Sequence, residues 1–97
     1  MASFIVSLRY TAPIEQVDEL LPDHVAWLRA NHATGRLLGW GRKVPRKGGI
    51  LLAVCEDRAE AEALAAADPF VTGGVAEFEV IEWAAGFLDD SIAGLAG

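Results

Sequence analysis

The chain is organised around the stretch Asp68-Pro69-Phe70-Val71-Thr72-Gly73-Gly74. An alanine-rich segment with helical spacing precedes it, and an alternating, strand-like segment follows it. Pro69 ends the helical segment, because the residue before a proline is driven out of the α region, and it can open a short new turn. The two glycines then let the backbone reverse. A turn requires neither the bulk of Phe70 nor the charge of Asp68, so we expect these side chains to have another use.

Asp68 continues the inward face of the helical segment that precedes it. A carboxylate directed at a core needs a partner, because burying an unpaired carboxylate is costly. His24 is the best candidate in the rest of the chain, since it lies between Leu21 and Leu28 on an apolar stripe with helical spacing. The pattern predicts a contact between His24 and Asp68.

Hydrophobic periodicity predicts the fold class. Strands are expected at residues 4–10, 36–42, 50–55 and 76–83, and helical regions at residues 13–34 and 57–67. Pro22 interrupts the first helical pattern, so we expect a short helix to about Leu20 and a longer one that restarts at Pro22. Asp57 and Glu60 have capping-box spacing at the start of the second. The order β-α-β-β-α-β predicts a ferredoxin-like α+β domain, with both helical regions on one face of a four-stranded antiparallel sheet.

The composition favours a single domain that associates with a second copy. All 97 residues fit one domain, with residues 84–97 as a weakly patterned tail. Residues 50–55 are apolar on both faces, as in a strand covered on both sides, whereas the helices of this fold cover only one face. We therefore expect a homodimer packed sheet to sheet.

Charge and cysteine content narrow the class of partner and the compartment. The net charge of −6 argues against a nucleic-acid binder and against binding to anionic membranes. No apolar stretch approaches the ~18 residues that span a bilayer, and residues 4–8 are too short for a signal sequence. The single Cys55 excludes an internal disulfide and fits a reducing compartment. We expect a cytoplasmic protein.

The residues that carry other kinds of chemistry do not form a known motif. Neither Ser7 nor Cys55 belongs to a nucleophile-elbow sequence, and Cys55 is expected to be buried and inert. His24 and His32 lie eight residues apart, and no cysteine or carboxylate completes a recognised ligand spacing. We expect no metal and no cofactor.

Several motifs together resemble the YCII-related (YciI-like) family. They are found at residues 21–24, 35–38, 41–46, 48–53, 67–71 and 73–75. The resemblance covers nearly the whole chain up to Trp83 and implies a ferredoxin-like fold that dimerises as an α+β barrel. It also implies an active site centred on a histidine and an aspartate, which correspond to His24 and Asp68. Some relatives carry a serine at the start of the third strand, where this chain has Gly48 and Gly49.

His24 and Asp68 each have a structural interpretation beside the functional one. An inward histidine is often a core residue with a satisfied hydrogen bond, and Asp68 can cap the turn that Pro69 opens. In the functional interpretation, the two helical regions are neighbours on the sheet, so the side chains converge at their edge. A carboxylate that holds one imidazole nitrogen fixes the tautomer and raises the basicity of the other, which prepares a general base. Both interpretations remain open at the level of sequence.

A basic segment at residues 42–47 contains four of the eight Lys and Arg residues. It is either a solvated hairpin loop or a collar that attracts an anionic or phenolic substrate. We predict Arg42, Arg46, Phe70 and Gly49 as substrate-binding residues. The aromatic residues either line a pocket or belong to the core or the dimer interface. They are Trp27, Trp40, Phe70 and Trp83.

The leading functional hypothesis is a small cofactor-free enzyme, a lyase or an isomerase. It would use His24 and Asp68 for general acid–base proton transfer on a small organic acid or a hydroxylated aromatic compound. The alternative is a non-enzymatic dimer that binds a small molecule or supports a partner. A third hypothesis, oxygen-dependent monooxygenase or haem chemistry, rests on fold analogy with other dimeric α+β barrels.

Overall fold

Within residues 1–96, which the computed structural model describes, the elements follow the predicted β-α-β-β-α-β order. They are β1 (Ala2–Tyr10), α1 (Ile14–Ala33), β2 (Leu37–Arg42), β3 (Gly48–Cys55), α2 (Arg58–Ala66), α3 (Pro69–Thr72), β4 (Ala76–Trp83) and η1 (Asp90–Ala96). The short helix α3 is a single turn between α2 and β4, and η1 is a 3₁₀ segment within the tail.

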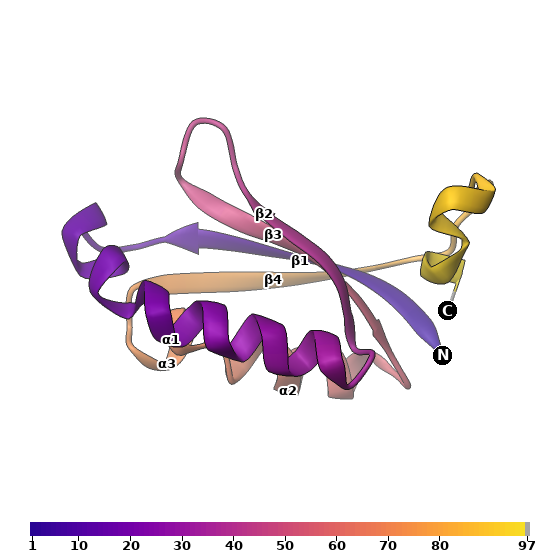
Figure 1. Cartoon of the computed structure of the whole chain (residues 1–97), viewed down its shortest axis with the longest axis horizontal. Coiled ribbons are helices and arrows are strands. Elements are labelled where there is room, and N and C mark those ends of the chain that lie inside the picture. The colour runs from indigo at the N-terminus through magenta and orange to yellow at the C-terminus, as the bar shows by residue number, and fades with distance from the viewer. Residues whose placement is uncertain (97) are drawn as a thin grey trace.

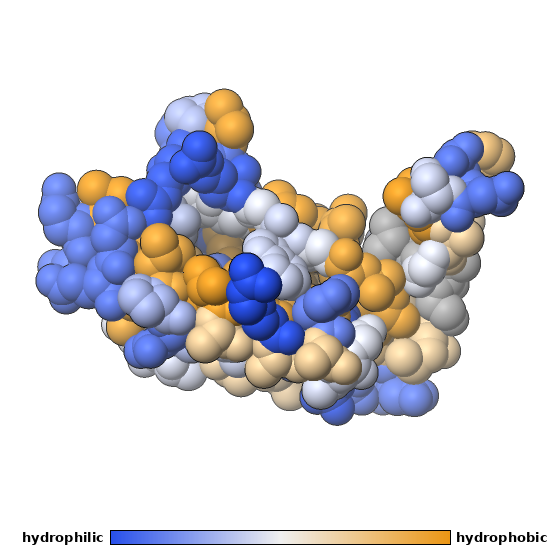
Figure 2. Space-filling view, in the orientation of Figure 1, coloured by the Kyte–Doolittle hydropathy of each residue, from blue (hydrophilic) through white to orange (hydrophobic). Residues whose placement is uncertain are grey.

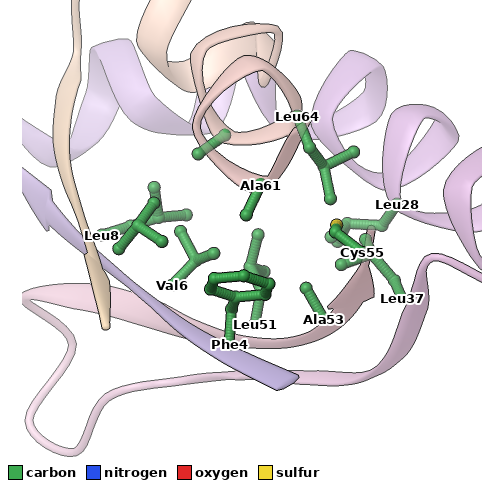
Figure 3. Packing of buried hydrophobic residues seen from close by; sticks show 12 residues of the cluster. Phe4, Val6, Leu8, Leu28, Leu37, Leu51, Ala53, Cys55, Ala61 and Leu64 are labelled. Carbon is green, nitrogen blue, oxygen red and sulfur yellow. The ribbon is translucent and has the colours of Figure 1, made fainter. Parts of the chain in front are cut away.

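The strands form one antiparallel sheet in the order β2-β3-β1-β4. In Figure 1 the helices α1 and α2 lie on the same side of this sheet. Alternation along β1 buries Phe4, Val6 and Leu8 on that side, where they pack with apolar residues of α1, α2 and β3 (Figure 3). The predicted ferredoxin-like α+β fold is confirmed.

The predicted break at Pro22 is wrong, because α1 continues through this residue. Pro22 lacks the N–H that would bond to the carbonyl of Asp18, so the helix loses one hydrogen bond there. Val17, His24 and Leu28 are buried along α1 on both sides of the proline. Packing of both halves onto the rest of the domain therefore outweighs the lost bond, and the helix bends in its first turns instead of ending (Figure 1).

The strand β3 begins at Gly48, two residues before its expected start. A Cβ atom at Gly48 would lie 1.8 Å from the carbonyl oxygen of Leu8, so only glycine lets β1 and β3 approach each other at this point. The connection between β2 and β3 is consequently limited to residues 43–47, named here the β2–β3 loop.

The face of the sheet opposite the helices remains partly open. Leu38 and Ile81 on this face are exposed, and η1 approaches one end of it, where Leu38 and Leu52 line a shallow pocket with Ile92. Figure 2 shows the surface hollowed between the raised β2–β3 loop and the C-terminal segment. α1 and α2 thus cover only one face of β3, η1 reaches only one end of the other face, and cover of that face by a second copy stays a prediction.

We expect the open face to hold a second copy, because it exposes Leu38 and Ile81, and apolar patches larger than ~300–600 Å² on a protein surface usually mark an interaction site. Sedimentation at micromolar concentration should give twice the chain mass of 10.3 kDa. Ile81→Lys on the open face should shift the protein toward the single-chain mass. Ile14→Lys is a matched control, because Ile14 lies on α1 and is 36% exposed against 42% for Ile81. A single-chain mass for the wild type would contradict the prediction.

Candidate active site

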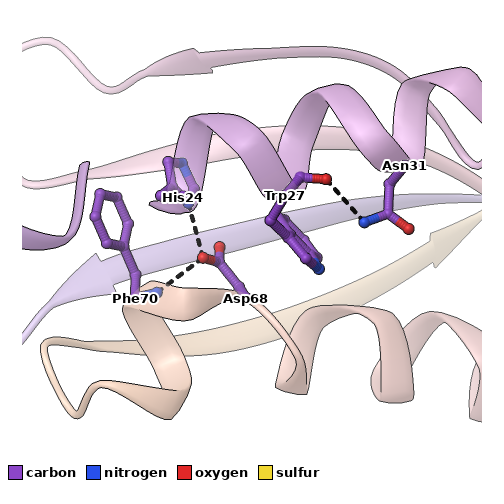
Figure 4. A network of polar contacts seen from close by, with 5 residues as sticks. All are labelled: His24, Trp27, Asn31, Asp68 and Phe70. Carbon is purple, nitrogen blue, oxygen red and sulfur yellow. Dashed lines mark hydrogen bonds and ion pairs between the residues drawn. The ribbon is translucent and has the colours of Figure 1, made fainter. Parts of the chain in front are cut away.

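His24 and Asp68 meet between α1 and the start of α3. The Nδ1 atom of His24 lies 2.7 Å from Oδ1 of Asp68, and the side chains are 10% and 0% exposed, respectively. Figure 4 shows the two groups directed toward each other, His24 from α1 and Asp68 from the turn that precedes α3. The position of Asp68 follows from Pro69, which starts α3 and leaves Asp68 as its N-cap. The contact predicted from inward spacing is present, and a catalytic role remains a prediction.

Asp68 is also a cap, so the structural interpretation holds, and the functional interpretation stays a prediction beside it. Its Oδ1 atom accepts a hydrogen bond from the backbone N–H of Phe70 at 2.9 Å. The same atom makes the contact with His24. Its Oδ2 atom is buried and has no hydrogen-bond partner among the residues that the structure describes. An unpaired buried oxygen is costly, and serine or asparagine caps a helix about as well as aspartate. Capping alone therefore does not explain an aspartate at this position.

The hydrogen bond to Asp68 determines which nitrogen of His24 is left for a ligand. A carboxylate accepts at Nδ1, which favours the tautomer with the proton on Nδ1 and a free lone pair on Nε2. The imidazole ring stacks on the ring of Phe70, with centroids 3.8 Å apart and planes 9° from parallel, and lies 6.2 Å from the ring of Trp27. These contacts hold the ring in one orientation and leave Nε2 as the atom able to exchange a proton.

His24 lines a cavity of about 270 Å³, a volume suited to a molecule smaller than a typical drug. Its apolar walls come from α1, β2, β3 and α3, and its polar groups come from α1, the strand ends and the β2–β3 loop. The lining residues are Tyr10, Leu21, His24, Val25, Leu28, Trp40, Gly41, Arg42, Arg46, Leu51 and Phe70. The combination of apolar walls, one histidine and two arginines suits a small molecule with an anionic or hydroxyl group.

The predicted substrate-binding residues do not all reach this cavity. Arg42, Arg46 and Phe70 line it, and so does Trp40. Gly49 does not, because β3 starts earlier than expected and Gly49 pairs within the sheet between Leu8 and Arg42. Trp27 and Trp83 are likewise not part of the lining.

Two residues near the cavity were missed from the sequence. Tyr10 ends β1 on the same face as its buried residues, and its ring makes an edge contact with Phe70 at 5.8 Å between centroids. Alternation in β1 was a usable signal for its direction. Asp18 pairs with Arg46 at 2.7 Å, and no local pattern connects two residues so far apart in the chain. The guanidinium of Arg46 also lies over the Tyr10 ring at 5.9 Å.

The two arginines of the cavity differ in their electrostatic surroundings. The hydrogen bond to Asp18, and then Tyr10, raise the pKa of Arg46, so that this group stays charged. Arg42 forms no ion pair with any residue in the described part of the chain. The basic segment at residues 42–47 is thus partly anchored to α1 and partly free to meet a ligand.

Other candidate chemistry is accounted for by the surroundings of each group. Cys55 is fully buried, and burial raises the pKa of its thiol, which confirms the expectation of a buried residue. His32 lies outside the cavity, with Nδ1 at 2.9 Å from the carbonyl oxygen of Leu37.

Residues 1–96 contain no cluster of three or more His, Cys, Asp or Glu placed to hold a metal ion. Over the same residues, no helix combines the length and the hydropathy needed to cross a bilayer.

Comparison with known proteins places the chain in a family. The YCII-related domain matches residues 3–84. The curated proteins contain no match to the chain. A solved structure of 5-chloro-2-hydroxyhydroquinone dehydrochlorinase (TftG) from Burkholderia phenoliruptrix AC1100, in complex with 2,5-dihydroxybenzoquinone, superposes with a TM-score of 0.73. The match covers 87% of this chain and 95% of the other at 20% identity, a level at which the likeness shows a shared fold.

Proposed function

The chain belongs to the YCII-related family, and from that premise we propose that it is an enzyme in which His24 moves a proton on a small hydroxylated aromatic compound or organic acid. One observation carries the proposal. His24 lines the cavity while its Nδ1 atom is held by a buried aspartate whose second oxygen has no hydrogen-bond partner within residues 1–96. This arrangement prepares a general base at Nε2.

The reaction class is elimination or isomerisation. Nε2 of His24 takes a proton from the bound molecule, and the electron pair left behind forms a new double bond. In an elimination that pair expels a leaving group, and in an isomerisation the proton returns to a different atom. Asp68 stabilises the imidazolium that forms, and Arg42 stabilises negative charge that develops on a substrate oxygen. The structural neighbour TftG, a dehydrochlorinase in complex with a hydroxylated quinone, supports this class.

Binding of 2,5-dihydroxybenzoquinone provides a direct test. In NMR titrations, the imidazole resonances of His24 should move with a saturable dependence on ligand concentration. His32 is an internal control, because it lies outside the cavity on the carbonyl of Leu37, and its resonances should stay in place. If neither this quinone nor a panel of phenols and small organic acids moves His24, the cavity is not a ligand site and the proposal fails.

A binding module without catalysis is the second candidate, and the capping role of Asp68 favours it. It predicts the same shifts of His24 without any turnover. Chloride release from 5-chloro-2-hydroxyhydroquinone, measured with wild type and His24→Gln, separates the two. If the compounds bind, but wild type and His24→Gln do not differ in any reaction of the bound compounds, the binding module is favoured.

A further inference from the structure

The two arginines at the His24 cavity are not equivalent charges. Arg46 donates a hydrogen bond to Asp18 at 2.7 Å, whereas Arg42 has no ion-pair partner among residues 1–96. The pair connects the β2–β3 loop with α1 beside the cavity, and the guanidinium of Arg46 also contacts the ring of Tyr10. Arg42, Arg46 and Asp18 together therefore contribute a charge close to that of one arginine, not of two.

We propose that Asp18 determines the charge selectivity of the cavity: it neutralises Arg46, so that Arg42 alone receives a ligand anion. The preferred ligand is then a planar molecule with a single negative charge, and dianions are disfavoured. This inference rests on the proposed function only in taking the cavity as the ligand site.

Repulsion is the physical basis of the discrimination. The guanidinium of Arg46 has donors left beyond the one given to Asp18, so it can contact a second acceptor. An anionic acceptor placed there lies close to the Asp18 carboxylate and is repelled by it. Both side chains are partly exposed, so solvent screens the repulsion, and the expected effect is about fivefold in affinity, which corresponds to ~1 kcal/mol.

Asp18→Asn isolates the charge from the geometry. The asparagine oxygen still accepts a hydrogen bond from Arg46, so the loop keeps its anchor while the negative charge is lost. Glu19→Gln is the matched control. It removes one negative charge from the neighbouring position of α1, where Glu19 is exposed and forms no ion pair with the described residues. Both substitutions change the net charge of the protein equally.

The test measures dissociation constants for benzoate and for phthalate by NMR, with His24 as the reporter of cavity binding. The ratio of the phthalate constant to the benzoate constant should fall about fivefold in Asp18→Asn and stay within about twofold in Glu19→Gln. Adding Arg46→Gln to Asp18→Asn should restore the wild-type ratio. Arg42→Ala should weaken benzoate binding.

Each other outcome overturns a definite part of the argument. An unchanged ratio in Asp18→Asn, or an equal change in Glu19→Gln, refutes the role of Asp18 and leaves the proposed function intact. If neither acid moves His24 in the wild type, the assignment of the cavity as an anion site fails, and the inference fails with it.

Discussion

Replacing His24 by alanine should lower the rate of the catalysed proton transfer by ~10²–10⁴-fold, the usual contribution of a general acid–base group. The reason is that no other titratable group of the cavity combines a buried carboxylate partner with a free ring nitrogen. The measurement is kcat on the hydroxylated aromatic compound identified by the binding test. His32→Ala should leave kcat unchanged, since His32 lies outside the cavity.

His24→Gln tests whether a loss of kcat comes only from misfolding. A glutamine amide can still donate to Asp68, so the buried carboxylate keeps a partner, but glutamine cannot take up a proton. Asp68→Asn preserves the shape of the site and the acceptor for the Phe70 N–H, while removing the charge that stabilises an imidazolium. It should lower kcat and alter the ring-nitrogen shifts that report the His24 tautomer. Activity of His24→Gln within a few-fold of wild type would contradict the role of His24 as the base.

Replacing Phe70 by alanine should destabilise the protein by ~3–5 kcal/mol, as is typical of a buried phenylalanine. The side chain is 2% exposed, and it packs with Val17 and Val75 in a second core cluster. It also stacks on His24 and contacts Tyr10 edge-on. The total free energy of unfolding of such a domain is ~5–15 kcal/mol, so the loss is a large fraction of it.

Urea unfolding of wild type and variant measures this effect. Phe87→Ala is the matched control, because Phe87 lies beyond β4 and is 84% exposed, and its removal should change stability by less than ~0.5 kcal/mol. Equal changes in the free energy of unfolding for the two substitutions would contradict a stabilising role of the cluster around Phe70. Phe70→Leu should fall between the two and should also disturb the resonances of His24, since the stacked ring is lost.

Local features of the sequence were sufficient to predict the order of the main elements and one long-range contact. The last strand was expected at residues 76–83 and is found at Ala76–Trp83. Asp57 was expected to cap the second helix, and its side chain accepts from the Glu60 N–H at 2.9 Å. The contact of His24 with Asp68 followed from two inward positions on helices that must share one sheet face. Periodicity and capping act between residues a few positions apart, so they can be recognised without the fold.

Only the tertiary structure decided the course of α1 and the charges around the cavity. The continuity of α1 through Pro22 depends on packing along its whole length, which outweighs the local preference of proline. How distant backbone segments approach one another determines the pairing of Asp18 with Arg46 and the position of Tyr10 beside them. It also determines that Oδ2 of Asp68 has no hydrogen-bond partner in the described part of the chain. Such contacts join residues that are separated by whole elements. Their geometry is set by the packing of helices on the sheet and not by the preferences of neighbouring residues.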